Sequence, residues 1–221
     1  MPEPTPAEPR FTRKGLSTRA RIVDSAAALM FERGVADTSV KDVRGAAAVS
    51  GSQMSHYFHD KRDLTRQVIA ARRGNVRAFH TAPRLAALDS IEALQEWADA
   101  CIADIDGVYC RGGCVYGSLA AELVDADEQI HQDLAAGYDE WISLFCAGLT
   151  AMRDRGNLVP EADPRHLAVC LVVAHQGGAM LTHVTGDPEP LRASVNAAVH
   201  YVRQFLTGPR PPKGRPRGRR S

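Results

Sequence analysis

The sequence predicts an all-α protein, and three observations support this fold class. Alanine and leucine, which favour helices, are plentiful, and few segments alternate β-branched and polar residues as strands do. Long segments also repeat their apolar residues at the helical period. With 221 residues and a hydrophobic fraction of 44%, the chain has room for one large domain or two small ones with a core.

The first helix is predicted from Thr18 to Gly34, after a proline- and charge-rich arm at residues 1–15 that we expect to be disordered. Three helix-start signals follow. Ser39, Ser50 and Asp60 each stand three residues before an acid or amide that completes a capping pattern. These signals predict short helices at about 39–46 and 50–56, and a longer helix from about 61 to 79.

Four further apolar stripes predict the helices of the second half. They cover residues 91–108, 130–152, 167–181 and 191–206, and the third is apolar nearly all round, which indicates burial on several sides. Residues 207–221 are basic and proline-rich and predict a disordered tail. This tail either adds non-specific DNA affinity through counterion release or only keeps the chain soluble.

Charge is distributed unevenly along the chain. Residues 10–80 carry 14 Lys and Arg against 6 Asp and Glu, residues 81–206 carry 7 against 18, and the last fifteen residues add 6 basic residues and no acid. A basic front half on an acidic body indicates one face that meets an anion and a separate body that does not.

The cysteine pattern and the first residues predict the compartment. The cysteines form no evident disulfide framework, and the N-terminus has no apolar segment of the kind that a secretory signal needs. The longest apolar run, 167–181, is too short to span a bilayer and contains His175 and Gln176. We therefore expect a soluble, cytoplasmic protein without a membrane partner.

Two short helices joined by a tight turn, the second polar and N-capped, predict a helix-turn-helix. Val49, Met54 and Phe58 are the predicted core anchors, which leaves small and polar side chains for base edges. The predicted base-facing residues are Gly51, Ser52, Gln53, Ser55 and His56. The predicted phosphate contacts are Lys14, Arg19, Ser39, Tyr57 and Lys61. The alternative is a surface loop, and if Gln53 completes its capping box it is not free to read a base.

Residues 18–64, "TRARIVDSAAALMFERGVADTSVKDVRGAAAVSGSQMSHYFHDKRDL", resemble the N-terminal domain of the TetR family of bacterial repressors. The segment from His56 to Phe58 and Lys61 fit the family pattern. Ala48 replaces the usual turn glycine, Ser52 replaces a second glycine, and Ser55 stands where an aromatic is common. The resemblance implies the same base-facing and phosphate-facing positions, and the departures affect which bases are preferred.

The body contains "RGGCVYGSLAAEL" and "HQGGAMLTHVTGDPEPLRASVNAAVHYV", which resemble the LmrA/YxaF-type subgroup of that family. The resemblance implies a sensor of aromatic or drug-like compounds. It also implies a homodimer through the last two helices, where Gly177 and Gly178 would allow close approach. The alternative is that these two helices complete the core of a monomer.

Large or polar-capable side chains on inward stripes are the candidates for a ligand pocket. They are Trp97, Tyr116, Trp141, Phe145, His175, Gln176 and Met180. Each aromatic is also a candidate for plain core, and a helix-to-helix hydrogen bond would satisfy His175 or Gln176 equally well. Cys110 and Cys114 are a possible thiol switch near Arg111, with buried, inert thiols as the alternative.

Together these expectations define a disordered arm (1–15), a helix-turn-helix DNA-binding domain (16–64), a ligand-binding and dimerisation domain (65–206) and a basic disordered tail (207–221). They predict a dimeric repressor that binds a near-palindromic operator in double-stranded DNA and is released by a small apolar or aromatic effector. The alternative is a helical ligand-binding or thiol-redox sensing protein with weak or no sequence-specific DNA binding. We find no catalytic constellation, cofactor motif or metal-ligand spacing, and so expect no enzyme.

Overall fold

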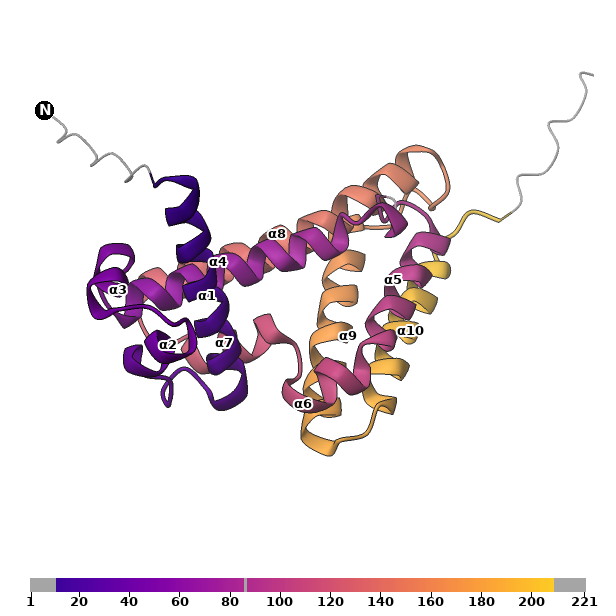
Figure 1. Cartoon of the computed structure of the whole chain (residues 1–221). Helices are drawn as coiled ribbons and strands as arrows, with labels where there is room; N and C mark the ends of the chain where they lie inside the picture. The colour runs from indigo at the N-terminus through magenta and orange to yellow at the C-terminus, as the bar shows by residue number, and fades with distance from the viewer. Residues whose placement is uncertain (1–10, 86, 209–221) are drawn as a thin grey trace, which may run out of the picture.

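The computed structural model of the chain describes residues 11–85 and 87–208 (Figure 1). These residues form helices, and among them the only β-type pairing is an isolated bridge between Leu158 and Leu206. The all-α prediction is confirmed. Most of the predicted arm and of the predicted tail lies outside the described residues.

The helices are α1 (Arg13–Arg33), α2 (Val40–Ala46), α3 (Gly51–Tyr57), α4 (Lys61–His80), α5 (Ile91–Ala103), α6 (Cys110–Gly112), α7 (Val115–Leu123), α8 (Glu128–Asp154), α9 (Pro164–Thr185) and α10 (Glu189–Arg203). A 3-10 turn covers Pro83–Leu85 and a π turn covers Ile105–Tyr109. The predicted helix over 91–108 is therefore interrupted at Asp104. The apolar pattern continues through the break, because Ile105 is buried like the residues of α5.

The helix α1 begins five residues before its predicted start, inside the segment assigned to the disordered arm. The Thr12 hydroxyl accepts a hydrogen bond from the Gly15 amide at 3.2 Å and caps the helix there. The first buried residue of α1 is Ile22, so its charged first turns carry no hydrophobic signal. The end is as predicted, because Gly34 has a φ of 85° and its amide donates to the carbonyl of Met30.

The helices α2 and α3 are fixed locally by their N-caps. In each one the cap serine, Ser39 or Ser50, accepts from the amide of the third helical residue. The side chain of that third residue, Asp42 or Gln53, accepts in return from the amide of the serine. The turn between the two helices holds Ala48 at a φ of 50°, in the left-handed region that favours glycine.

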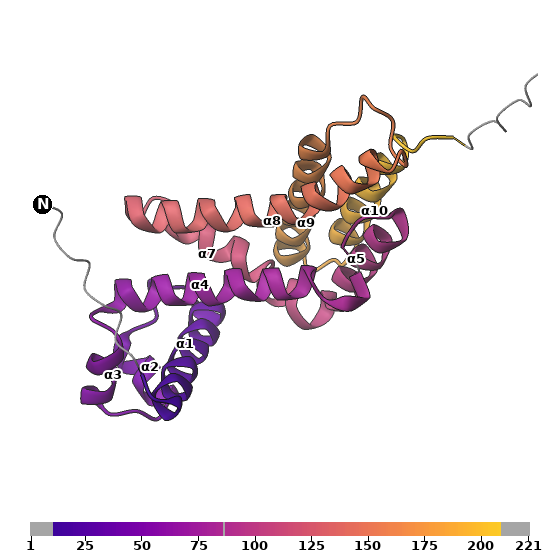
Figure 2. The same cartoon turned by 90° about the horizontal axis from the view of Figure 1, so that it is seen from above.

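Two long helices, α4 and α8, lie beside each other and join the N-terminal bundle of α1, α2 and α3 to a body formed by α5, α9 and α10 (Figures 1 and 2). Two close approaches hold the body together. A Cβ on Gly148 of α8 would lie 2.3 Å from the carbonyl oxygen of Leu88, and a Cβ on Gly178 of α9 would lie 2.1 Å from the Ser194 hydroxyl oxygen of α10. The close approach at Gly178 therefore occurs within one chain and not, as predicted, between two.

The helix α7 makes a second connection between the body and the N-terminal bundle. The Glu122 carboxylate accepts hydrogen bonds from the amides of Val35 and Ala36, which follow α1, at 2.8 and 2.7 Å. The same helix carries Tyr116, whose hydroxyl donates to the Leu134 carbonyl of α8 at 2.8 Å. The N-terminal bundle is thus attached to the body through α4 and, independently, through α7.

Candidate nucleic-acid interface and ligand cavity

The outer surface of α3 consists of small and polar side chains. The predicted base-facing residues are all exposed or half-exposed: Gly51, Ser52, Gln53, Ser55 and His56. Three apolar anchors hold the helix and its turn against the bundle and are 4 to 9% exposed: Val49, Met54 and Phe58. The segment is therefore a packed helix with one polar face, and not a surface loop.

Three of the base-facing side chains already have partners within the helix or its cap, and for Ser52 the partner is the Ser50 hydroxyl, 2.9 Å away. The Oε1 atom of Gln53 accepts from the Ser50 amide at 2.9 Å, so the capping box considered for this residue is formed. The Ser55 hydroxyl donates to the carbonyl of Gly51 at 3.1 Å. A contact between the Gln53 oxygen and a base would require this cap to open.

Three of the predicted phosphate contacts lie at the surface of the bundle. Lys14 is exposed in the first turn of α1. The Ser39 hydroxyl donates to the Asp42 carboxylate at 2.6 Å, and the Lys61 ammonium donates to the carbonyl of Ala36 at 3.1 Å. Ser39 and Lys61 are thus engaged within the protein.

The other two predicted phosphate contacts pack against neighbouring side chains. Arg19 donates to the amide oxygen of Gln67 at 2.5 Å, and its guanidinium carbon lies 5.8 Å from the ring centroid of Phe58. Tyr57 lies against Phe11, with the ring centroids 5.2 Å apart. The contacts of Arg19 favour a role in positioning α1 against α4 over a phosphate contact.

Two exposed cations at this surface are absent from the predicted set. Arg44 of α2 lies beside the start of α3, because its Nη1 atom is 3.5 Å from the position of a Cβ on Gly51. Lys41 stands in the first turn of the same helix. The three-residue spacing between Lys41 and Arg44 put them on one face of the predicted helix, which was the signal available in the sequence.

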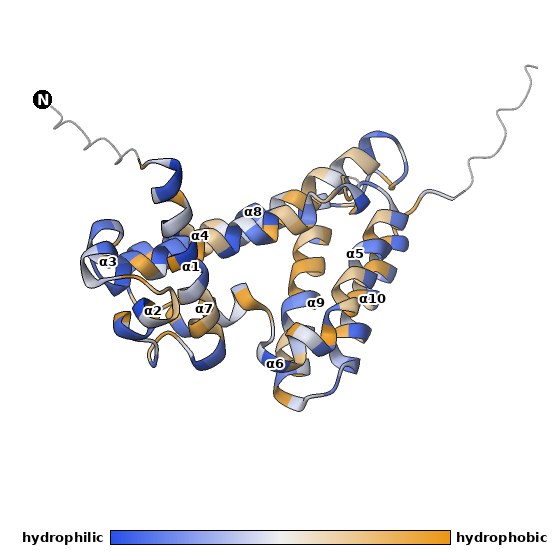
Figure 3. Ribbon diagram, in the orientation of Figure 1, coloured by the Kyte–Doolittle hydropathy of each residue, from blue (hydrophilic) through white to orange (hydrophobic). Residues whose placement is uncertain are grey.

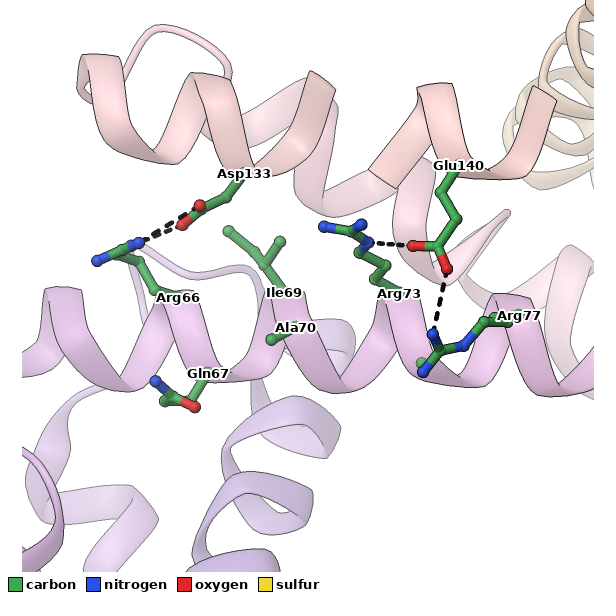
Figure 4. A pocket seen from close by; sticks show the side chains of 9 residues that line it. Arg66, Gln67, Ile69, Ala70, Arg73, Arg77, Asp133 and Glu140 are labelled. Atoms are coloured by element: carbon green, nitrogen blue, oxygen red, sulfur yellow. Dashed lines mark hydrogen bonds and ion pairs between the residues drawn. The ribbon is translucent and has the colours of Figure 1, made fainter. Parts of the chain in front are cut away.

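The side of α4 that faces α8 carries a row of ion pairs, seen in part in Figure 4. This arginine row consists of Arg62 with Asp127, Arg66 with Asp133, and Arg73 and Arg77 with Glu140. A groove of about 360 Å³ runs along it. The charged side chains that line this groove are already paired, so it offers little to an apolar effector.

A different cavity, of about 430 Å³, lies beside the C-terminal half of α4. Its volume is typical of sites for small organic molecules. The wall is mostly apolar or aromatic with a few polar groups: Arg72, Asn75, Val76, Phe79, His80, Asp104, Val108, Tyr109, Cys114, Val115, Tyr116, Trp141 and His175. These residues come from α4, the segment between α5 and α7, α7, α8 and α9, which are far apart in the sequence. Only the fold brings them together.

His80, the last residue of α4, receives hydrogen bonds from both tryptophans of the chain. Its Nδ1 atom is 2.7 Å from the Val76 carbonyl and therefore carries the ring proton. Its Nε2 atom accepts from the indole nitrogens of Trp97 at 3.1 Å and Trp141 at 2.8 Å. Burial lowers the pKa of His80 to about 4, and a second ring proton would point at two N–H donors. The ring is neutral at pH 7.

His175 of α9 is the second buried histidine of the cavity. Its Nε2 atom and the Tyr109 hydroxyl are 2.8 Å apart, and its ring lies edge-on to Trp141 at 5.1 Å. Burial, with a smaller contribution from His80, lowers the pKa of His175 to about 3. Its Nδ1 atom is buried and has no hydrogen-bond partner among residues 11–85 and 87–208. A helix-to-helix hydrogen bond therefore satisfies one ring nitrogen and leaves the other available.

The seven predicted pocket residues separate into three groups. Tyr116, Trp141 and His175 line the cavity, whereas Trp97 and Phe145 are fully buried behind it. Gln176 and Met180 line a separate surface groove between α7 and α9.

For Met180 the predicted inward orientation is wrong, because its side chain is 67% exposed. The helix α9 is apolar on both its inner and outer faces, so periodicity did not distinguish them. Gln176 donates to the Cys114 sulfur at 3.3 Å.

The cysteine pair considered as a thiol switch is in an unfavourable environment. Burial raises the pKa of the Cys114 thiol, which opposes formation of the reactive thiolate. The Cys110 sulfur lies 4.0 Å from the carbonyl of Gly186. For Cys114 the alternative of a buried, inert thiol fits this arrangement better than a thiol switch.

Much of α9 is coloured as hydrophobic in Figure 3, and part of its apolar surface is exposed. The large hydrophobic side chains in this part are 56 to 73% exposed: Val173, Met180, Leu181 and Val184. Of the described helices, α9 alone is long and apolar enough to cross a membrane, and 44% of that stretch is buried inside the protein. The exposed Tyr201 of α10 lies at the other end of α9, with its ring centroid 6.3 Å from that of His166.

A three-helix bundle with a polar recognition helix, joined by a long helix to a helical body with a half-open cavity, defines a helix-turn-helix regulator of transcription. Residues 22–68 match the family described as bacterial regulatory proteins, tetR family. Residues 90–198 match the family described as tetracyclin repressor-like, C-terminal domain. The chain belongs to the TetR family of transcriptional regulators.

Similar proteins share this architecture. The chain is 23% identical over 174 residues to the HTH-type transcriptional repressor DhaR of Mycobacterium sp. (strain GP1), covering 78% of this chain and 86% of that protein. A TetR regulator from Chloroflexus aurantiacus superposes with a TM-score of 0.76 at 24% identity, covering 88% of this chain and 98% of that one. A TetR regulator from Cytophaga hutchinsonii gives 0.77 at 16% identity, with 90% and 100% covered. The two structural matches show the shared fold.

Proposed function

We propose that this regulator is a repressor that binds a near-palindromic operator as a homodimer and is released by a small ligand. The exposed polar face of α3 carries the proposal. Its small residues at the helix N-terminus allow the backbone to approach a major groove, and Gln53 and His56 supply hydrogen-bonding groups for base edges. Lys14, Lys41 and Arg44 are exposed cations on the same domain and suit phosphate contacts.

The apolar outer face of α9 supports dimerisation through the last two helices. Val173, Met180, Leu181 and Val184 form one exposed stripe, and a second copy of the chain would remove this stripe from water. Gly177 lies in the same stripe with no atom of the described residues within 4 Å of its side-chain position. We expect sedimentation analysis to give the mass of a dimer, and the substitution Val184→Asp to shift it to a monomer.

The cavity supports a ligand response because α4 forms part of its wall. A ligand that binds better to one orientation of α4 than to another would shift the spacing of the two α3 helices in a dimer. The mostly apolar wall favours an effector with an aromatic or aliphatic body. The likeness of the body to the LmrA/YxaF-type subgroup agrees with such a ligand and remains a prediction. We expect the protein in the cytoplasm, where it would meet DNA, and we expect no catalytic activity.

The second candidate function is a helical ligand or thiol sensor that does not read DNA sequence. The departures from the family pattern at Ala48, Ser52 and Ser55 favour it. The small residues at the N-terminus of α3 oppose it, because they keep the close approach to a major groove that a reading helix needs. The raised pKa of Cys114 opposes the thiol variant of this candidate.

Selection from genomic fragments distinguishes the two functions. Purified protein is incubated with sheared DNA of its source genome, washed at moderate salt, and the retained fragments are sequenced. We expect enrichment of one palindromic site by the wild type and its loss in the double variant Gln53→Ala, His56→Ala. Thermal melting of each variant shows whether it is folded.

The matched control is Gln132→Ala on the exposed surface of α8, which should retain the site. If the wild type, the double variant and the control all retain the same unselected fragments, the DNA-reading function is wrong. Binding would then arise only from the basic charge of the N-terminal domain.

A further inference from the structure

The helix α4 contains five arginines, and one of them differs from the rest in its surroundings. Arg62, Arg66, Arg73 and Arg77 belong to the arginine row, in which each is paired with an acid. Arg72 forms no ion pair within residues 11–85 and 87–208. It lies on the other side of the helix, in the wall of the cavity.

Arg72 is also partly buried, unlike a solvated surface cation. Its Nε atom is buried and has no hydrogen-bond partner in the described part of the chain. Burial lowers the pKa of its guanidinium, and the nearest counteracting charge is that of Asp24 on α1. The side chain is half-buried, and its buried Nε–H has no acceptor; an anion in the cavity would supply one.

The rest of the cavity supplies a second hydrogen-bonding group and a body-binding surface. The unpartnered Nδ1 atom of His175 is nine-tenths or more buried, since the residue is 2% exposed. The Tyr109–His175 hydrogen bond sets the tautomer of the neutral ring: when the Tyr109 hydroxyl donates to Nε2, Nδ1 carries the proton and is a donor. Phe79 and Trp141 give an apolar surface next to these donors.

We infer that the effector of this cavity is a small organic acid, with an aromatic or short aliphatic body in the cavity and one carboxylate on Arg72. This inference rests on the proposed ligand response and names the chemical class of the ligand. A carboxylate matches the planar fork of the guanidinium and forms a charge-assisted pair of hydrogen bonds with it. Asp104 also lines the cavity, but it is exposed to solvent, so its charge is screened and does not favour a cationic ligand over an anionic one.

Matched pairs of ligands test the charge directly. The probes are phenylacetate, 4-phenylbutyrate, 1-naphthylacetate and octanoate, each compared with its own primary amide. The amide keeps the shape and removes the negative charge. In calorimetric titrations of the full chain we expect at least one acid to bind about tenfold to hundredfold more tightly than its amide, as for a buried charge-assisted hydrogen bond.

Three variants assign this preference to a residue. Arg72→Gln should reduce the affinity for the acid to that for the amide and leave the affinity for the amide unchanged. Arg72→Lys should retain part of the preference, because it keeps the charge and loses the fork. Arg77→Gln is the matched control, since it removes an exposed and paired arginine of the same helix, and should retain the whole preference. Circular dichroism and thermal melting confirm that each variant is folded.

Two results overturn the inference: no acid of the panel binds more tightly than its amide, or the preference persists in Arg72→Gln. Retention of operator DNA is measured on the same samples and separates this outcome from failure of the proposed function. An Arg72-dependent acid that leaves DNA retention unchanged supports the inference and contradicts ligand release. An amide that releases DNA as well as its acid supports ligand release and contradicts the inference.

Discussion

The N-terminal bundle and the body of this regulator are specified by different kinds of interaction. The helices α2 and α3, of seven residues each, are too short to be stable alone, and each begins at a capping box whose partners are three residues apart. The body depends on contacts between residues that are far apart in sequence. His80 and Trp141, or Gly148 and Leu88, are examples. The comparison teaches that local signals define the bundle, whereas the body is sensitive to single atoms at long-range contacts.

The largest effect that this comparison predicts is that of Gly148→Ala in α8. The new Cβ would lie 2.3 Å from the Leu88 carbonyl oxygen and 2.6 Å from that of Ala87, and backbone atoms cannot rotate away. We expect a loss of about 3 kcal/mol in the free energy of unfolding, the upper end of overpacking costs, measured by urea titration.

Gly74→Ala in α4 is the control, because a Cβ there meets no atom of the described residues within 4 Å. It should be neutral or stabilising, since alanine favours helices over glycine. Equal losses in the two variants would contradict the close approach between α8 and the segment before α5.

The next effect concerns pH and the buried histidines of the body. Folding lowers the pKa of His80 from 6.5 to about 4, so the unfolded chain binds a proton more readily than the folded one. The stabilisation from the neutral ring is fully present above about pH 6.5 and is lost as the pH falls towards 4. For His80 alone this amounts to about 3 kcal/mol.

The free energy of unfolding, followed by urea titration between pH 7 and 4, measures this loss. His175, whose pKa is lowered to about 3, contributes in the same direction. In His80→Gln the slope of the free energy of unfolding against pH should be smaller, by the amount that corresponds to the uptake of about one proton on unfolding. An unchanged slope would show that His80 does not titrate between these limits.

A smaller and opposite effect is expected in the bundle. Ala48 has a φ of 50°, and a left-handed conformation costs a residue with a Cβ about 1 kcal/mol relative to glycine. Ala48→Gly should therefore raise the free energy of unfolding by about that amount. Ala46→Gly, two residues earlier and within α2, should lower it. Thermal melting compares the two, and destabilisation by both would contradict the strained turn.

The smallest effect is expected from the arginine row. Arg73 pairs with Glu140 at a partly exposed site, and pairs near the surface contribute about 0.5 kcal/mol. We expect Arg73→Gln to lower the free energy of unfolding by no more than this, and high salt to abolish the difference. A double-mutant cycle with Glu140→Gln isolates the pair, and a coupling well above this value would place the row among the body's essential contacts.

The parts of the fold that could be predicted from the sequence are those with local causes. The starts of α2, α3 and α4 follow from Ser39, Ser50 and Asp60, whose partners are a few residues away. The start of α1 was predicted too late, because Thr12 caps a turn without buried residues. The break at Asp104 was not predicted, because Ile105 continues the apolar pattern into the π turn.

The candidate cavity was accessible from the sequence only in part. Trp141 and His175 were expected to face inward because polar or large groups in an apolar stripe need partners. His80 and Arg72 lie on a helix whose charged composition suggested only solvent exposure, and their roles depend on residues from α5 to α9. For Met180 the apolar pattern of α9 fitted two faces of the helix equally well. Only the packing of α9 against α10 decides which of these faces is buried.

The carboxylate of Glu122 has a mechanical consequence. Because it holds the backbone at Val35 and Ala36 while α4 holds the other side of the bundle, the bundle is attached at two separate points. A bundle attached at one point could swing freely relative to the body. With two attachments, unequal movements of α4 and α7 would instead rotate the bundle. Tyr116 on α7 and Arg72 on α4 border the same cavity, so its two walls are also the two attachments. In the proposed ligand response, a change in the width of that cavity would therefore change the angle of α3.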